Sequence, residues 1–216
     1  KPRKDSRYLI GRKYSDFLAY MDQHPDVKVV EMDTVYNDVS NGPFLQTFKF
    51  RQYDLLICIY QAVKDSLHML DGILLLEGVL GKEMFAKEVE IILTDRGSEF
   101  ILAQEAEMRE NGTRRTRMFY CDSMASWQKG SLENVHLLIR EICPKGCDLY
   151  ALGLTSQEKA NLISSHINSY PKEKLHGRSS LQLIHFFNEE MAKKLCGFGI
   201  TEIPPDEVIL KPYLLK

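Results

Sequence analysis

Two kinds of hydrophobic pattern alternate along this chain. Short runs rich in apolar and β-branched residues predict strands, whereas segments whose apolar residues recur every three or four positions predict amphipathic helices. Strands are predicted at residues 27–35, 44–51, 55–61, 89–94 and 117–121. Helices are predicted at residues 15–22, 64–80 with a continuation through 84–87, 98–110, 126–141, 155–169 and 179–195.

The order of these elements predicts the fold class. After the short helix at 15–22, three strands follow one another, and the turn-forming residues 37–43 between the first two favour an antiparallel meander. The strand at 89–94 is wholly apolar, which is typical of a strand in the middle of a sheet that is covered on both faces. We therefore expect an α/β fold, an RNase H-like mixed five-stranded sheet flanked by helices, with extra C-terminal helices.

Two of the predicted helices have recognisable faces. In the helix at 64–80, one face carries Leu67, Leu70 and Leu74. In the helix at 126–141, the apolar stripe consists of Leu132, Val135, Ile139 and Ile142. Glu133 projects away from that stripe, and Arg140, seven residues later, lies on the same helical face as Glu133.

Composition places the chain among ordinary globular proteins, and its charge is unevenly distributed. The 216 residues are 44% hydrophobic and carry a net charge of −2, which argues against a strongly basic nucleic-acid wrapper. Residues 1–13 hold six Lys and Arg residues against one Asp, a local charge of +5, so the rest of the chain sums to −7. This asymmetry suggests either a basic arm joined to an acidic body or a solvated terminus.

The chain shows no sign of export or membrane insertion. No run approaches the ~18 consecutive apolar residues of a membrane span, and no signal-peptide pattern opens the sequence. Five cysteines, an odd number, do not resemble a disulfide framework. We therefore expect a cytoplasmic protein, at the bacterial nucleoid if its substrate is DNA, with no membrane partner.

Three acidic residues lie at the ends of core elements. Asp33 is within the first strand, and Asp95 directly follows the strand at 89–94, at the carboxyl end where ligands bind in open α/β sheets. Glu133 is near the start of its helix. Each has a structural explanation as well: a strand-end Asp turned outward, a turn Asp before Gly97, and a first-turn Glu favoured by the helix dipole.

Together, these carboxylates are suited to metal chemistry. Hard oxygen ligands suit Mg²⁺, which takes the rest of its coordination shell from water and substrate phosphate. Two such ions about 3.5–4 Å apart clamp the attacking and leaving oxygens in phosphoryl transfer. Glu31 shares the strand face of Asp33 by the period of two and is a candidate for an outer group.

Several linked motifs carry a family resemblance. VEMDTV at 30–35, TDRGSEF at 94–100, the segment FYCDSMASWQKGSLENVHLLIREICPKGCDL at 119–149, HINSYP at 166–171 and the tail IPPDEVILKPYLLK occur in this order. In this pattern the chain resembles the DDE transposases of bacterial insertion sequences, and more narrowly the insertion sequence thirty family. The similarity spans roughly residues 14–216. Arg96 stands where the family usually has Asn.

The resemblance implies a catalytic triad and a reaction. Asp33, Asp95 and Glu133 would hold two Mg²⁺ or Mn²⁺ ions, cleave DNA at the element ends and transfer the freed 3′-hydroxyl to target DNA. The expected DNA-binding residues are Gln128, Lys129, His136, Arg140 and Arg96. Gln128 and Lys129 would position DNA, and Arg140 would pair with a phosphate.

The resemblance also implies a domain organisation and partners. We expect residues 1–25 to be a basic arm and linker from an absent N-terminal DNA-binding region, 26–195 the RNase H-like integrase catalytic core, and 196–216 a C-terminal tail. The expected partners are double-stranded DNA, as terminal inverted repeats and target, and further copies of the chain in a synaptic complex. Two alternatives stay open: a non-catalytic DNA-binding or assembly remnant of a transposase, and a hydrolytic RNase H-like nuclease.

Overall fold

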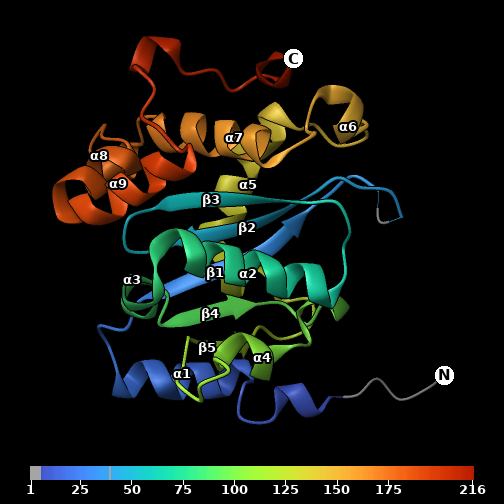
Figure 1. Ribbon diagram of the computed structural model, residues 1–216, viewed down its shortest axis with the longest axis vertical. Coiled ribbons are helices and arrows are strands. Elements are labelled where there is room, and N and C mark those ends of the chain that lie inside the picture. Colours follow the sequence, from blue (N-terminus) through green and yellow to red (C-terminus); the bar gives the residue numbers. More distant parts are fainter. Residues whose placement is uncertain (1–5, 39) are drawn as a thin grey trace.

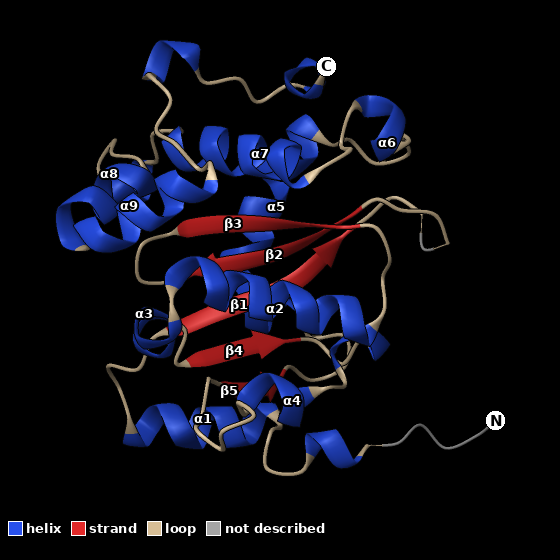
Figure 2. Cartoon of the chain, viewed as in Figure 1, coloured by secondary structure: helices blue, strands red, loops and turns tan. Residues whose placement is uncertain are grey.

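A five-stranded mixed sheet forms the centre of the computed structural model, which describes residues 6–38 and 40–216. Its strands, drawn red in Figure 2, run in the order β3-β2-β1-β4-β5. β1 pairs antiparallel with β2, and β2 antiparallel with β3, whereas β4 runs parallel to β1 and β5 parallel to β4. The strand bounds are Val29–Val35, Phe44–Phe50, Leu55–Gln61, Ile91–Thr94 and Arg117–Tyr120. The predicted fold class is confirmed.

Helices cover both faces of the sheet, as Figure 1 shows. One face carries α2 (Ser66–Leu80) and α3 (Lys82–Glu88), and α5 (Gly130–Ile142) lies behind the sheet with α7 (Gln157–Ser169) packed against β3 and α5. α1 (Tyr14–Gln23) contacts β5 at one edge. The remaining elements are α4 (Ala103–Glu107), α6 (Leu149–Leu152), α8 (Ser180–Phe187), α9 (Glu189–Phe198) and six short 3-10 turns.

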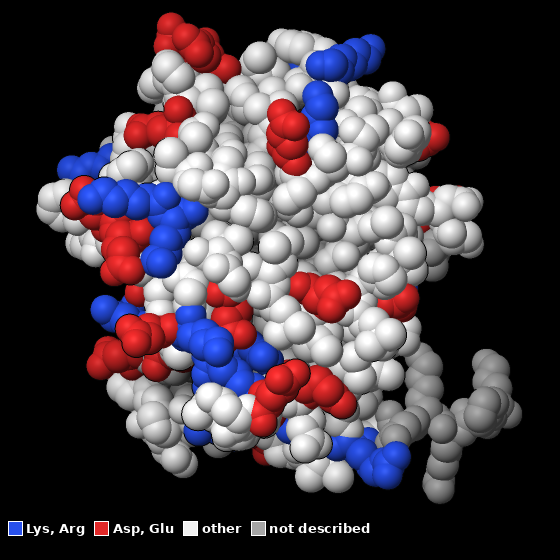
Figure 3. Space-filling view, viewed as in Figure 1, with Lys and Arg blue, Asp and Glu red and all other residues white. Residues whose placement is uncertain are grey.

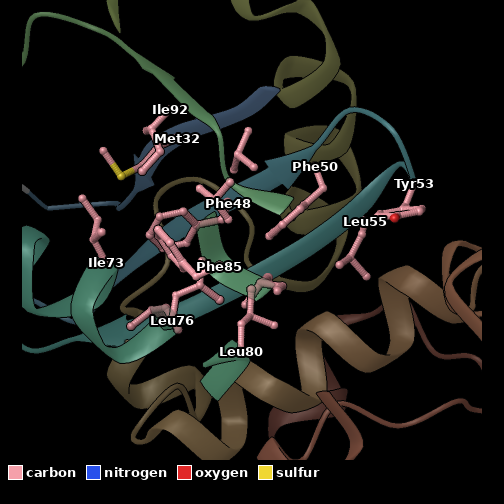
Figure 4. Close-up of a cluster of buried hydrophobic side chains, with 14 of the residues drawn as sticks. Met32, Phe48, Phe50, Tyr53, Leu55, Ile73, Leu76, Leu80, Phe85 and Ile92 are labelled. Carbon is pink, nitrogen blue, oxygen red and sulfur yellow. The ribbon is translucent and has the colours of Figure 1, made fainter. Parts of the chain in front are cut away.

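Alternation along the strands divides the interior into two main cores. Met32, Phe48 and Phe50 point toward α2 and α3, where they meet side chains such as Ile73 and Phe85 (Figure 4). The residues that alternate with these along the strands point to the other face of the sheet, toward α5 and α7. Val35, Leu45 and Cys58 are among them. Full burial of a large apolar side chain contributes about 1.5–3 kcal/mol. These two cores therefore fix the sheet between its helical layers.

The helix predicted at 98–110 is wrong in extent. Residues Ser98–Phe100 form a 3-10 turn, and the α-helix that follows, α4, ends at Glu107. Met108 then leaves the helix and makes a β-bridge to Arg114. The buried carboxylate of Glu107 is held by Arg12 at 2.7 Å and by the backbone N–H of Met118, so tertiary contacts end the helix early.

Two other predicted helices are each divided. Gly81, with a positive φ of 79°, separates α2 from α3 where one continuous helix was expected. Asn188 divides the segment predicted at 179–195 into α8 and α9, because its side chain accepts a hydrogen bond from the Met191 N–H and so begins a new helix. α6 was not predicted. A 3-10 turn at Ser126–Lys129 precedes α5.

The buried side of α2 is not the one that the leucine spacing indicated. Leu67 is 64% exposed and Leu74 38% exposed, whereas Met69, Ile73 and Leu76 are buried against the sheet. Gly72 lies on that buried side, and a Cβ there would come within 1.8 Å of the Gln46 Oε1 atom. α2 therefore packs on the sheet through its smallest residue.

The chain segments outside the expected catalytic core pack against it. Arg12 pairs with Glu107, and Phe17 of α1 is buried beside Phe119 of β5. At the other end, Leu215 is buried among residues of α5 and α7. Residues 1–5 of the expected basic arm lie outside the described residues, and the domain boundaries at residues 25 and 195 stay predictions. Within the described part of the chain, no helix has the length and apolar character needed to span a membrane.

Candidate active site

Asp33 and Asp95 meet at the carboxyl ends of two neighbouring parallel strands. β1 and β4 pair in the register Glu31 to Leu93, and two residues further along each chain stand Asp33 and Asp95. The ammonium of Lys129 lies between them, 2.8 Å from Asp33 Oδ2 and 3.8 Å from Asp95 Oδ2. The fold therefore places both aspartates next to one ammonium group.

Each aspartate is held by one oxygen and presents the other to Lys129. Asp33 Oδ1 accepts a hydrogen bond from the Thr34 N–H at 2.7 Å, and Asp95 Oδ1 accepts one from the Gly97 N–H at 2.8 Å. Burial disfavours the charged form of Lys129, but Asp33 and Asp95 more than offset that cost and raise its pKa. Lys129 is thus a positive charge, 5% exposed, at the point where two carboxylates converge.

The partial burial of Asp95 changes the pKa of its carboxyl group. Desolvation raises the pKa of this carboxyl, Lys129 opposes the shift, and the neighbouring Asp33 adds to it. The carboxylate of Glu99 also approaches, because a Cβ on Gly97 would lie 2.5 Å from Glu99 Oε2 and 3.0 Å from Asp95 Oδ1. Only glycine at position 97 leaves room for both carboxylates. Lys64 compensates the charge of Glu99 at 2.5 Å.

Glu133 is positioned by the anchoring of α5 on β1. Glu31, fully buried, accepts a hydrogen bond from the Leu132 N–H at 2.7 Å, in the first turn of α5, and pairs with Arg51 at 2.6 Å. The helix therefore begins directly over β1, with the side chain of Glu133 exposed. The charges of Asp33 and Glu133 both act on His136.

His136 faces the sheet. Its Nε2 atom lies 3.2 Å from Thr47 Oγ1, and that hydroxyl donates to the carbonyl oxygen of Asp33 at 3.2 Å. Because the single hydroxyl proton is used there, the ring nitrogen donates to Thr47. Burial lowers the pKa of His136 to about 4, so the ring is neutral at pH 7. Its expected contact with DNA stays a prediction.

Gln128 and Arg96 hold the loop that leads into α5. Gln128 is buried, accepts from the Asp122 N–H at 2.7 Å and donates to Asp122 Oδ2 at 3.1 Å. Arg96 donates to the other oxygen, Asp122 Oδ1, at 2.8 Å and to the Cys121 carbonyl at 2.9 Å. Both side chains brace residues 121–128, and the guanidinium of Arg96 is directed to this loop. Their DNA contacts stay predictions.

Arg140 is directed toward the end of β1. Its guanidinium donates to Asn37 Oδ1 at 2.6 Å and to the Tyr36 carbonyl oxygen at 3.1 Å, and also contacts the Cys143 carbonyl. Asn37 in turn donates to the carbonyl oxygens of Pro144 and Cys147. This network ties the C-terminal end of α5 to the segment after β1. The expected pairing of Arg140 with a phosphate stays a prediction.

The carboxylate oxygens at this edge of the sheet supply some of the ligands that a hard divalent cation needs. Asp33 and Asp95 supply carboxylate oxygens around a point where the protein already places a positive charge. Among residues 6–38 and 40–216, however, no group of three or more His, Cys, Asp and Glu side chains is close enough to hold a metal ion. The two aspartates thus fit such an ion, and Glu133 lies in the first turn of α5.

The fold and this acidic edge define a class of protein. The chain has an RNase H-like fold, a mixed five-stranded sheet covered by helices. In a solved simian T-cell lymphotropic virus intasome in complex with PP2A regulatory subunit B56 gamma, the matched chain aligns with 73% of this chain and 54% of its own length, at a TM-score of 0.55 and 14% identity. No protein-family model matches the sequence.

Within that class, the chain is similar to insertion-sequence transposases. It is 32% identical over 111 residues to the transposase for insertion sequence element IS1086 of Cupriavidus metallidurans, covering 50% of this chain and 31% of that protein. It is 29% identical over 90 residues to transposase InsI for insertion sequence element IS30A of Escherichia coli, covering 42% and 22%. The resemblance expected from the motifs is confirmed. The matched segments span less than a third of either relative.

Proposed function

We propose that this chain is the catalytic domain of an insertion-sequence transposase, which cleaves DNA at the ends of its element and joins the freed ends to target DNA. The observation that carries the proposal is the convergence of Asp33 and Asp95 on one cationic group, Lys129, at the carboxyl edge of an integrase-type sheet. The similarity to two transposases supports the same reaction class.

Asp33, Asp95 and Glu133 are the residues that would hold Mg²⁺ or Mn²⁺. When bound, a pair of such ions supplies positive charge to the attacking and leaving oxygens of an in-line displacement. Asp33 and Asp95 contribute the oxygens that now face Lys129, and Glu133 contributes an exposed carboxylate from the first turn of α5. To expose those oxygens, Lys129 must leave its position between them.

The side chains around this edge would align the DNA strand. Lys129, once released from the aspartates, carries a charge suited to a backbone phosphate, and its flexible stem allows the movement. Arg96 does not oppose this use of the edge, because its charge is balanced by Asp122 rather than directed at Asp95. Gln128 keeps Asp122 and the loop before Lys129 in place.

The substrates and assembly follow from the reaction. Double-stranded DNA enters both as the terminal inverted repeats of the element and as the target. Since two element ends have to be joined to one target, the active assembly is a homo-oligomer in which each chain supplies one site. A DNA substrate of this kind places the protein in the bacterial cytoplasm, at the nucleoid.

Cleavage of DNA that carries an element end tests the proposal. Wild-type protein with Mg²⁺ or Mn²⁺ should release a product with a 3′-hydroxyl, and Glu133→Gln should reduce its rate by at least about 100-fold, since loss of one electrostatic catalytic group costs 10²–10³. Glu141→Gln is the matched control, because Glu141 is an exposed carboxylate on the same helix.

Three results would contradict the proposal. Equal product from the wild type and Glu133→Gln would remove Glu133 from the site. Cleavage without joining of the 3′ end, in a reaction supplied with target DNA, would support the hydrolytic nuclease. DNA binding by folded protein with no cleavage at any Mn²⁺ concentration would support the non-catalytic remnant.

A further inference from the structure

A second cluster of charged side chains surrounds Asp54, in the turn between β2 and β3. Lys49 of β2 contacts Asp54 Oδ1 at 2.5 Å, Lys172 contacts Oδ2 at 2.6 Å, and Lys174 contacts Oδ1 at 2.6 Å. The carbonyl oxygen of Asp54 also accepts hydrogen bonds from Lys49, Lys172 and the Ser180 hydroxyl. Segments more than 100 residues apart thus converge on one aspartate.

The charges in this cluster do not balance. When all three lysines are protonated, three ammonium groups face a single carboxylate, a local excess of two positive charges, while the exposed fractions of Lys49 and Lys172 are only 1% and 9%. An unpaired buried charge is costly unless a counter-ion or a hydrogen-bonding partner compensates it. Burial, followed by the repulsion of Lys172, lowers the pKa of Lys49 to about 7 despite the attraction of Asp54. The cluster lacks negative charge.

A cavity opens directly onto these lysines. It has a volume of about 180 Å³, and its lining consists of Lys49, Asp54, Lys172 and Lys174 together with Ser131, Asn134, Val135 and Leu138 of α5. A water molecule occupies about 30 Å³ of liquid, so the cavity has room for a group of several heavy atoms. Beside the Asp54 carboxylate and two apolar side chains, the lining therefore holds three lysines and two neutral hydrogen-bonding side chains, and ammonium, hydroxyl and amide groups are donors that bind phosphate oxygens.

We propose that Lys49, Lys172 and Lys174, with Ser131 and Asn134, form a binding site for a phosphate group. Lysine binds phosphate as a point charge, and the three ammonium groups converge from different elements, as binding of a multi-oxygen anion requires. One added phosphodiester charge cancels half of the excess of two, and a phosphate dianion cancels all of it.

The place of the site in the fold favours a phosphate of the DNA backbone. Ser131 and Asn134 flank Glu133 on α5, and Lys49 stands on β2 two residues along from Thr47, which is paired with Asp33. A DNA strand that reaches the acidic edge therefore passes close to this cavity. The DNA source rests on the proposed function, whereas binding of phosphate as such does not.

Calorimetric titration with sodium phosphate, at constant ionic strength, tests the site itself. The wild-type chain should bind phosphate, and Lys174→Gln and Lys49→Met should each weaken binding at least about tenfold. Lys174 is half-exposed, so its substitution leaves the interior intact. Lys87→Gln, which removes an exposed lysine on α3 across the sheet, should bind as the wild type does.

Binding to a DNA duplex of arbitrary sequence, measured by fluorescence anisotropy over a salt series, tests the source. Loss of one phosphate contact lowers the slope of log affinity against log salt by about 0.9, which we expect for Lys174→Gln and not for Lys87→Gln. Weakened phosphate binding with an unchanged slope would assign the site to free phosphate. Phosphate binding that is absent from the wild type, or equal in all variants, overturns the proposal, whatever the cleavage assay gives.

Discussion

Lys129 is the residue on which the candidate site depends most. Asp33 and Asp95 lie at neighbouring strand ends, where two carboxylates repel each other, and the ammonium of Lys129 relieves that repulsion. A divalent cation that binds the same oxygens competes with this ammonium. The structure thus gives Lys129 two opposite effects: it stabilises the fold in the absence of metal and weakens metal binding.

Lys129→Met separates these effects. Without added metal, the variant should lose about 1–2 kcal/mol of unfolding free energy, because a partly exposed ion pair is broken. In calorimetric titrations it should bind Mn²⁺ about tenfold more tightly than the wild type, since no ammonium has to be displaced. Lys28→Met, which breaks the ion pair with Glu88, is the control and should leave Mn²⁺ affinity unchanged. Unchanged or weaker Mn²⁺ binding by Lys129→Met would be inconsistent with competition.

The lowered pKa of Lys49 predicts that the stability of the folded protein depends on pH. Its pKa is lowered to about 7 by burial and by Lys172, with Lys174 adding to the shift and Asp54 opposing it, whereas an unfolded lysine has a pKa of about 10.4. Between these values the unfolded chain binds a proton that the folded chain lacks, so this residue makes stability rise as the pH increases from 7. Below pH 7 its contribution is constant.

Urea unfolding at pH 6, 7, 8 and 9 checks this dependence. The increase in unfolding free energy between pH 7 and 9 should be smaller in Lys49→Met than in the wild type. Lys87→Met should follow the wild-type curve, because its side chain is exposed. Parallel curves for Lys49→Met and the wild type would show that Lys49 keeps an ordinary pKa in the folded protein.

At the scale of elements, hydrophobic periodicity predicted the buried face of α5 correctly and the buried face of α2 incorrectly. The stripe of α5 is buried as expected, because all four of its apolar residues face the sheet side. The face of α2 was misjudged, because Met69, Ile73 and Leu76 also recur at helical spacing and are the buried ones; Gly72 lies among them, against the amides of Gln46 and Gln61. Periodicity carries no information about such polar pairs.

Substitutions at two glycines of α2 measure the importance of that contact. Gly72→Ala places a Cβ 1.8 Å from Gln46 Oε1 and 2.7 Å from Gln61 Nε2, so thermal or urea unfolding should show a loss of about 1–3 kcal/mol. Gly78→Ala on the same helix meets no atom within 4 Å and should stabilise the protein by about 0.5–1 kcal/mol. Equal effects at the two positions would refute close packing at Gly72.

The anchoring of α5 on β1 explains how the exposed carboxylate of Glu133 is held in position. Glu31 bonds to the first turn of α5 and to Arg51, which fixes the start of the helix on β1. The period of two placed Glu31 on the face of Asp33 and suggested an outer group, but its two partners come from segments 20 and about 100 residues away. Contacts over such separations are not visible in a single sequence.

For the whole molecule, the near-neutral charge of −2 conceals local groups of charged side chains. On the face covered by α2, Figure 3 shows acidic and basic side chains side by side toward α3 and α9, with a largely uncharged centre. The opposite face, with α5, carries Lys129 and the lysines around Asp54.

The order of strands and the motif carboxylates were predictable for the whole chain, because they depend on local pattern and on linked motifs. The position of Lys129 between Asp33 and Asp95 was not, since it depends on how the loop at 121–128 is held by Gln128 and Arg96. The triad that the motifs indicate is therefore represented in the structure by two converging aspartates and a helix that carries the third residue.

Anomalous diffraction from crystals grown with Mn²⁺ tests the central claim most directly. We predict Mn²⁺ bound to Asp33 and Asp95, with Glu133 contributing a ligand and the ammonium of Lys129 moved out from between the aspartates. Crystals of Glu133→Gln should show weaker Mn²⁺ occupancy. An absence of Mn²⁺ from these carboxylates, at a concentration that supports DNA cleavage, would contradict the assignment of this edge as the catalytic site.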